Sequence, residues 1–119
     1  MSAADPKRGE VWLAYTPGPS RDEHHPRFAL IVSADALNRN REHVMVVPIF
    51  STGTLGPTRL VIPADGTGLR QAGVLFCEEL TTIDKPLFEP EVGPRGHVHA
   101  ALLEAVVLAV RRALGDMSG

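Results

Sequence analysis

Residues 27–33 read Arg-Phe-Ala-Leu-Ile-Val-Ser, and this run is nearly all apolar after its first residue. Such a run is typical of a central strand that is buried on both faces of a sheet. Before it, residues 10–15 (EVWLAY) are aromatic and β-branched, and they predict a first strand that ends before two prolines. After it, residues 34–37 predict one helical turn, and residues 44–50 (VMVVPIF) predict a third strand in which Pro48 indicates a bend or an edge.

The chain between residues 51 and 92 alternates short apolar runs with turn-forming residues. Residues 51–57 are a loop of small residues, and residues 63–68 form a turn. Eleven glycines and ten prolines favour strands joined by tight turns over a helical bundle. Further strands are predicted at residues 58–62, at residues 73–78 and, as a short one, within residues 87–92.

From His97 onward the spacing of the apolar residues becomes that of an amphipathic helix. One face is predicted to carry Leu103, Val106, Val107, Val110 and Leu114. Arg111 and Arg112 fall in the last turn, where the helix dipole favours cations, and Gly115 is expected just past the end. We therefore predict a mainly β fold with α, a small β-barrel or twisted sheet closed by a C-terminal helix.

Length and composition exclude several classes of protein. With 119 residues the chain is expected to form a single domain, flexible at residues 1–7 and 116–119. No apolar run approaches the roughly 20 residues of a membrane helix, and the polar N-terminus is unlike a secretory signal, so we expect a cytoplasmic protein. The single cysteine, Cys77, agrees with a reducing compartment and is expected to be an inert buried thiol. A net charge of −2 gives no global basic field, so any contact with nucleic acid must be local.

Several short motifs, in this order and spacing, resemble one family. They are Arg8-Gly9-Glu10-Val11-Trp12, Arg27-x5-Ser33, Val46-Val47-Pro48-Ile49, Thr81-Thr82-Ile83-Asp84 and the final helix. Together they resemble the MazF/PemK toxins of bacterial toxin–antitoxin pairs, which include Kid. The resemblance implies an SH3-like or CcdB-like barrel, a homodimer, and a sequence-selective endoribonuclease that cleaves single-stranded RNA without a metal and is inhibited by an antitoxin.

The chemistry implied by this resemblance is attack of a ribose 2′-hydroxyl on the adjacent phosphate, which passes through a phosphorane of increased negative charge. A fixed cation stabilises that charge. Arg27 stands six residues before Ser33, as the family's catalytic arginine stands before its Ser or Thr, and a forked guanidinium suits phosphate well. The alternative is an exposed arginine at the start of a strand, paired with Asp22 or Glu23.

The family's second catalytic element is a hydroxyl two residues after the proline of the third strand, and here that position is Phe50. Phenylalanine offers neither a donor nor a proton relay. Ser51 and Thr52 follow at once and are the candidates to replace the hydroxyl. The alternative is that both only cap the turn before Gly53.

Phe76 and Glu78 stand where Kid-like members carry Arg and Asp. Glu78 keeps a carboxylate that could act as general base. Phe76 loses a cation, and it either stacks on an RNA base or is a buried core residue.

The loop at residues 21–26 corresponds to the segment that gates RNA and antitoxin in the family. Arg21, Asp22, His24 and His25 are its candidate RNA contacts, and the alternative is a solvated loop without a dedicated role. The histidines lack the spacing of a metal site, so we expect no metal, and no phosphate-binding loop points to a nucleotide cofactor.

Two other functions remain open. One is a binding module on the same barrel with reduced catalysis, suggested by Phe50 and Phe76. The other is a gyrase-directed, CcdB-like toxin, which has less support because residues 116–119 lack the bulky aromatic of gyrase-binding members.

Overall fold

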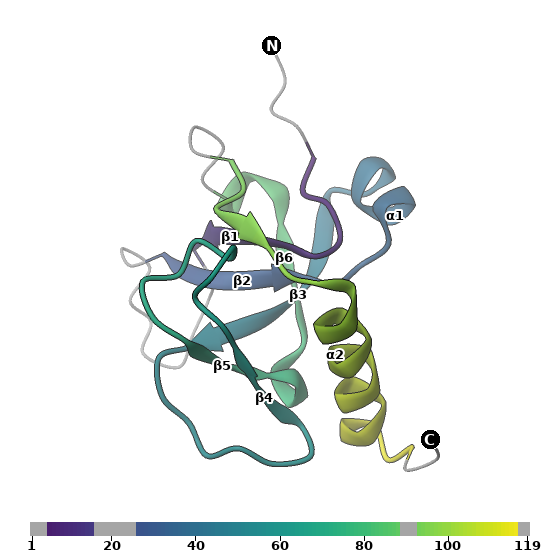
Figure 1. Cartoon of the computed structure of the whole chain (residues 1–119). Coiled ribbons are helices and arrows are strands. Elements are labelled where there is room, and N and C mark those ends of the chain that lie inside the picture. The colour runs from purple at the N-terminus through teal and green to yellow at the C-terminus, as the bar shows by residue number, and fades with distance from the viewer. Residues whose placement is uncertain (1–4, 16–25, 89–92, 117–119) are drawn as a thin grey trace.

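Seven antiparallel strands form one curled sheet in the computed structural model, which describes residues 5–15, 26–88 and 93–116 (Figure 1). Along the sheet the strands follow the order β4-β5-β3-β2-β1-β7, and β6 pairs with β3. The elements are β1 (Glu10–Ala14), β2 (Arg27–Ile31), α1 (Asp35–Asn40), β3 (His43–Phe50), β4 (Arg59–Ile62), β5 (Gly73–Phe76), β6 (Thr81–Asp84), β7 (Gly96–His97) and α2 (Ala100–Ala113), with short 3-10 turns η1 (Cys77–Glu79) and η2 (Lys85–Leu87).

Strand β3 is the spine of this sheet. One edge pairs with β2, while the other pairs first with β6 through residues 43–46 and then with β5 through residues 49–50. The carbonyl of Met45 accepts a hydrogen bond from Val32 N at 3.0 Å, so alternation directs the nitrogen of Pro48 away from β2, into the gap between the two ladders. A proline there removes no ladder hydrogen bond, so Pro48 is tolerated in a strand that pairs on both sides, and the predicted edge position is wrong.

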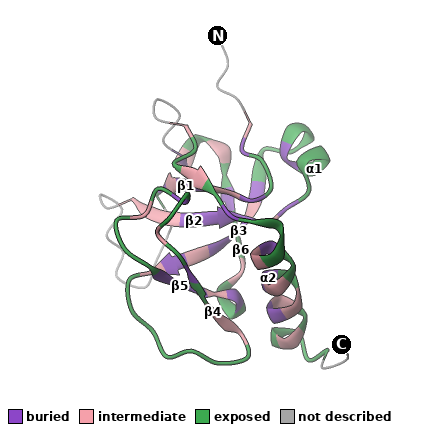
Figure 2. Cartoon of the chain, in the orientation of Figure 1, coloured by how far each residue is buried: buried purple, intermediate pink, exposed green. Residues whose placement is uncertain are grey.

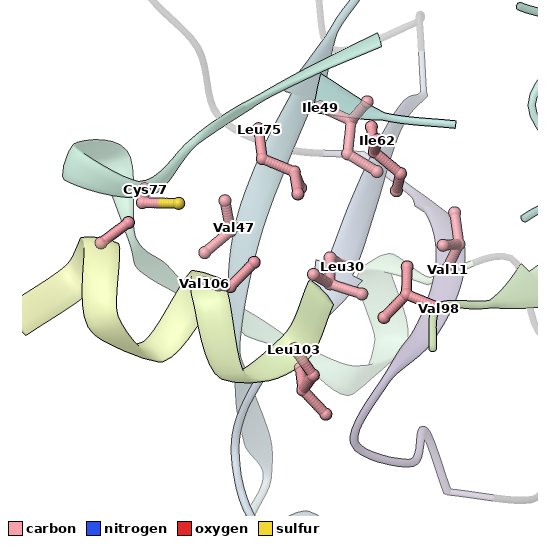
Figure 3. Packing of buried hydrophobic residues seen from close by; sticks show 11 residues of the cluster. Val11, Leu30, Val47, Ile49, Ile62, Leu75, Cys77, Val98, Leu103 and Val106 are labelled. Atoms are coloured by element: carbon pink, nitrogen blue, oxygen red, sulfur yellow. The ribbon is translucent and has the colours of Figure 1, made fainter. Parts of the chain in front are cut away.

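Hydrophobic cores lie on both faces of the sheet. Helix α2 covers one of them, where its Leu103, Val106 and Ala109 pack against residues from five strands (Figure 3). The opposite face holds Trp12 and Phe88, whose rings meet edge to face with centroids 5.7 Å apart. This second cluster consists of Trp12, Ala14, Ala29, Ile31, Val44, Val46, Ile83 and Phe88. The expectation of a small curled barrel closed by a C-terminal helix is thus confirmed, as a half-barrel.

Helix α2 begins three residues later than the spacing predicts, because Gly96 and His97 pair with β1 as strand β7. Leu103 and Val106 are buried as predicted, but Val107 and Leu114 are 40% and 80% exposed. Figure 2 shows exposed residues at both ends of α2 and buried ones between. Gly115 follows the helix at φ +92°, and its left-handed conformation confirms the predicted end.

Three other boundaries differ from the sequence prediction. The strand predicted at residues 73–78 ends at Phe76, and turn η1 follows it. The short strand predicted within residues 87–92 is wrong for residues 87 and 88: Leu87 ends η2 and Phe88 forms an isolated bridge to Ala14, while residues 89–92 lie outside the described ranges. The paired strand of this region is β6, and the predicted helical turn is the longer α1.

None of the described helices is long and apolar enough to cross a membrane.

Candidate functional site

Four neighbouring strands place two arginines and two phenylalanines on one face of the sheet. Arg59 on β4 is the register partner of Phe76 on β5, and Phe50 on β3 pairs with Val74, two residues before Phe76. The register of β2 and β3, continued two residues beyond Ala29 and Pro48, sets Arg27 opposite Phe50. Side chains two residues apart on a strand share a face, so the four residues form one row.

The row is a continuous stack of cations and rings. The Arg27 Cζ atom lies 5.7 Å from the centroid of the Phe50 ring. The rings of Phe50 and Phe76 have centroids 4.4 Å apart and an interplanar angle of 50°. The Arg59 Cζ atom lies 4.0 Å from the centroid of Phe76. Both guanidiniums are within cation–π range, one at each end of the ring pair. We call these four residues the arginine–phenylalanine row.

Glu78 binds the Arg59 end of the row. Its Oε2 accepts hydrogen bonds from Arg59 Nε at 2.8 Å and from Nη2 at 2.7 Å, and its Oε1 accepts one from the Thr58 hydroxyl at 3.0 Å. The Arg59 hydrogen bonds are the main reason why the pKa of the Glu78 carboxyl lies below its ordinary value. Glu78 is therefore a carboxylate at neutral pH, anchored on turn η1 rather than on a strand.

The loop after β3 carries the candidate hydroxyls. Ser51 and Thr52 are both exposed. Gly53 lies so close to Phe76 that a Cβ atom placed on it would be 2.6 Å from Cε1 and 2.7 Å from Cζ of the ring. The loop backbone therefore rests on the Phe76 ring. Ser51 also lines a pocket of about 400 Å³ together with Phe28, Ile49, Phe50, Leu69, Arg70, Gln71, Ala72 and Gly73.

The structure thus brings together part of the predicted site. Arg27, Phe76 and Glu78 belong to one continuous surface, and Ser51 and Thr52 border it. Phe76 is half-buried, with its ring in contact with Phe50, Arg59 and Gly53. The predicted loop contacts Arg21, Asp22, His24 and His25 lie outside the described residues.

Arg59 is the site residue that the sequence did not reveal. The observation that reveals it is the register of β4 with β5, which sets Arg59 opposite Phe76, the position where the resemblance leads one to expect an arginine. That register is visible only once the strands are paired.

Ser33, the second residue of the Arg27-x5-Ser33 motif, has a structural role. Its hydroxyl donates to Asn38 Oδ1 and accepts from Met45 N at 2.9 Å, and Asn38 Nδ2 donates to the Ser33 carbonyl at 3.1 Å. Both side chains are buried. The network joins the end of β2 to α1 and β3, and thereby fixes the strand on which Arg27 stands.

Among residues 5–15, 26–88 and 93–116, no three His, Cys, Asp or Glu side chains gather closely enough to hold a metal ion. Cys77 is 1% exposed, and burial raises the pKa of its thiol to about 11. This agrees with the inert thiol expected from the sequence.

Known proteins resemble this chain in sequence and in fold. Endoribonuclease PemK of Escherichia coli is 36% identical over 83 residues, which are 68% of this chain and 62% of that protein. A mycobacterial endoribonuclease, solved in complex with its cognate antitoxin, superposes with a TM-score of 0.77 at 24% identity, covering 96% of this chain and 99% of that one. MazF of Deinococcus radiodurans gives a TM-score of 0.75 at 24% identity, with 94% and 98% covered.

The two structural likenesses concern the fold, whereas a family model concerns the sequence itself. The model described as the PemK-like, MazF-like toxin of type II toxin–antitoxin systems matches residues 7–115. Because this match spans nearly the whole chain, from the residues before β1 to the end of α2, the chain belongs to the PemK-like, MazF-like toxin family.

Proposed function

We propose that the chain is the toxin of a type II toxin–antitoxin pair, a sequence-selective endoribonuclease that cleaves single-stranded RNA. The observation that carries this proposal is the arginine–phenylalanine row, which holds Arg27 at one end and the Arg59–Glu78 pair at the other in a chain of this family. The name of the E. coli relative, an endoribonuclease, supports the activity. The mycobacterial complex supports an antitoxin as partner.

The proposed reaction needs no metal. The 2′-oxygen bonds to the adjacent phosphorus, the bond from phosphorus to the 5′-oxygen breaks, and the proton of the 2′-hydroxyl passes to water. The leaving 5′-oxygen takes a proton from water, so the products are a 2′,3′-cyclic phosphate and a 5′-hydroxyl end. Arg27 neutralises the phosphorane, and Ser51 or Thr52 donates to a phosphoryl oxygen in place of the hydroxyl missing at Phe50. We assign Glu78 to the orientation of Arg59 instead of the general-base role that the resemblance implies, because both of its oxygens accept hydrogen bonds and its lowered pKa makes it a weaker base.

The pocket beside Ser51 gives this surface a place for one unstacked base. Its lining is mainly apolar, with Phe28 and Leu69 among its walls, while Arg70 and Gln71 supply donors at its edge. Apolar walls with a few polar groups are typical of small-ligand sites. We assign Phe76 to the support of this surface, and we propose Arg21, Asp22, His24 and His25 as further RNA contacts on the evidence of the sequence alone.

We propose that the toxin acts in the cytoplasm as a homodimer without a cofactor. The exposed Val107 on α2 and Leu114 just after it are apolar surface that a second copy could cover. The mass of the purified protein in solution, measured by light scattering, tests the dimer.

A binding module with reduced catalysis is the second candidate. The observation that favours it is Phe50, which fills the hydroxyl position and lies under the Arg27 guanidinium. Such a protein would bind RNA through the same surface and leave it intact.

The deciding experiment incubates the purified protein, with EDTA present, with a long RNA of mixed sequence, and maps the cut sites and end groups. Wild type is expected to cut at one short sequence and leave 5′-hydroxyl ends, and Arg27→Ala is expected to cut at least 100-fold more slowly. Arg111→Ala is the matched control, an exposed arginine in an ion pair with Asp116 at the end of α2. Binding without cleavage by wild type would establish the second candidate, and equal rates for Arg27→Ala and wild type would overturn the role of Arg27.

A further inference from the structure

We propose that Arg59 is a second phosphate-binding residue of this site, which supplies from β4 the cation that Kid-like relatives carry at the position of Phe76. This inference rests on the proposed ribonuclease function. It concerns a residue that neither the sequence motifs nor the family resemblance pointed to.

The register of the sheet places Arg59 where the missing arginine would be. Arg59 and Phe76 are direct partners across β4 and β5, so their side chains rise from the same face at neighbouring points. The Arg59 guanidinium lies over the Phe76 ring, with Cζ 4.0 Å from the centroid. A long side chain from β4 thereby brings its charge above β5, over the residue that replaced the cation.

Contacts on two sides hold the Arg59 guanidinium in one orientation. The ring of Phe76 lies against it, and Glu78 binds its Nε and Nη2 edge, while Thr58 in turn donates to Glu78. Nη1 has no acceptor among the described residues, and the side chain is 32% exposed. A guanidinium restrained in this way loses little freedom when it donates to a phosphoryl oxygen.

The two rings act as a rigid spacer between Arg59 and Arg27. Phe50 contacts Phe76 on one side and lies under Arg27 on the other. The guanidiniums are therefore separated by the width of the ring pair, which is more than one phosphate occupies. Arg27 and Arg59 would bind different phosphates of one strand, so that Arg27 serves the reacting phosphate and Arg59 fixes the register of the RNA.

This division of roles predicts different kinetic signatures. Arg59→Ala is expected to raise KM about tenfold with little change in kcat, because a contact made equally in the ground state and the transition state contributes to binding alone. Arg27→Ala lowers kcat. Arg59→Lys is expected to restore only part of the lost RNA affinity, since an ammonium has no flat face to lie over Phe76 and cannot donate to Glu78 from two nitrogens.

The salt dependence of RNA binding tests the contact directly. The probe is an oligonucleotide with the mapped cleavage sequence and a 2′-deoxy nucleotide at the reacting position, which binds without being cut. Loss of one phosphate contact on a single strand lowers the slope of log Kd against log salt by about 0.7. Arg59→Ala is expected to show this change, and Arg111→Ala, with its own ion pair on α2, is expected to keep the wild-type slope.

Glu78→Gln gives a result of opposite sign that misfolding does not produce. The amide oxygen still accepts from Arg59 while the competing negative charge is gone, so the uncleavable probe is expected to bind several-fold more tightly. An unchanged slope in Arg59→Ala, together with unchanged binding in Glu78→Gln, overturns the role of Arg59 while cleavage by wild type upholds the proposed function. Absence of any cleavage and any RNA binding by wild type overturns both.

Discussion

Gly53→Ala tests whether the loop that carries Ser51 and Thr52 is positioned by its contact with Phe76. A Cβ atom there would lie 2.6 Å from Cε1 and 2.7 Å from Cζ of the ring. Gly56 in the same loop is the matched control, because a Cβ atom on it meets nothing within 4 Å. Neither glycine has a positive φ, so alanine brings no backbone strain at either position.

The size of the effect follows from these distances. Carbon atoms pack at about 3.5–4.0 Å, so the loop or the ring must move by about 1 Å to admit the methyl group. If the ring stays in place, overpacking costs about 1–3 kcal/mol, reduced by the 0.4–1 kcal/mol or so that alanine gains through the unfolded chain. The loop is exposed and yields more easily, and a displacement of about 1 Å in a catalytic group can cost about 100-fold in rate.

We therefore expect Gly53→Ala to cleave RNA about 100-fold more slowly and to lose no more than about 2 kcal/mol of unfolding free energy. Gly56→Ala should keep the wild-type rate. The measurements are kcat/KM on the mapped cleavage sequence and urea denaturation. Equal kcat/KM and equal stability for the two variants would show that the contact with Phe76 does not position the loop.

Three further predictions concern stability and reactivity. Asn38→Ala should lose about 1–3 kcal/mol in urea denaturation because it leaves Ser33 without its buried partner, whereas the exposed Asn40→Ala should lose less than about 0.5 kcal/mol. Cys77, with its pKa raised to about 11, should resist alkylation at pH 8 in the native protein and react once urea unfolds it; rapid native labelling would contradict this. Because the pKa of Glu78 is lower in the folded protein, its carboxylate stabilises the fold fully above the unfolded-state pKa of about 4.3, and this stabilisation is lost as the pH falls through the folded-state pKa. The difference in unfolding free energy between wild type and Glu78→Gln should therefore shrink as the pH is lowered below about 4.3.

The elements that the sequence predicts well are those with strong local patterns. The apolar run at residues 27–33 and the strand at residues 44–50 appear within two residues of their predicted bounds, because a strand buried on both faces admits few polar residues. The errors occur where burial continues after the hydrogen bonding has changed. Cys77 is as buried as a strand residue, yet Leu80 N bonds back to its carbonyl and closes a 3-10 turn.

The predicted start of α2 was wrong for a related reason. His97 fits the beginning of a helical pattern, but its partner Glu10 lies far away in the chain and pairs it into β7. Local spacing carries no information on such a partner. The helix face shows the same limit, since periodicity groups Leu114 with Leu103, although the sheet that buries Leu103 does not extend to Leu114.

The residues of the candidate site also differ in whether local sequence or strand pairing reveals them. Arg27, Phe76 and Glu78 could be named from their motif positions, whereas Arg59 could not, because its relation to Phe76 exists only across two paired strands. The replacement of a hydroxyl by Phe50 was visible in the sequence. Its packing between Arg27 and Phe76 was not, since it depends on three strands coming together.

The position of α2 in the chain has a consequence for the making of the protein. This helix is the last described element to be synthesised, yet Leu103, Val106 and Ala109 complete the core over β1 to β5. A nascent chain that ends before α2 leaves Val11, Leu30 and Val47 open to water on that face, and burying such side chains is worth about 1.5–3 kcal/mol each. For the ribonuclease proposed here this order of events is protective: the messenger is translated through α2 before the enzyme able to cut it has folded.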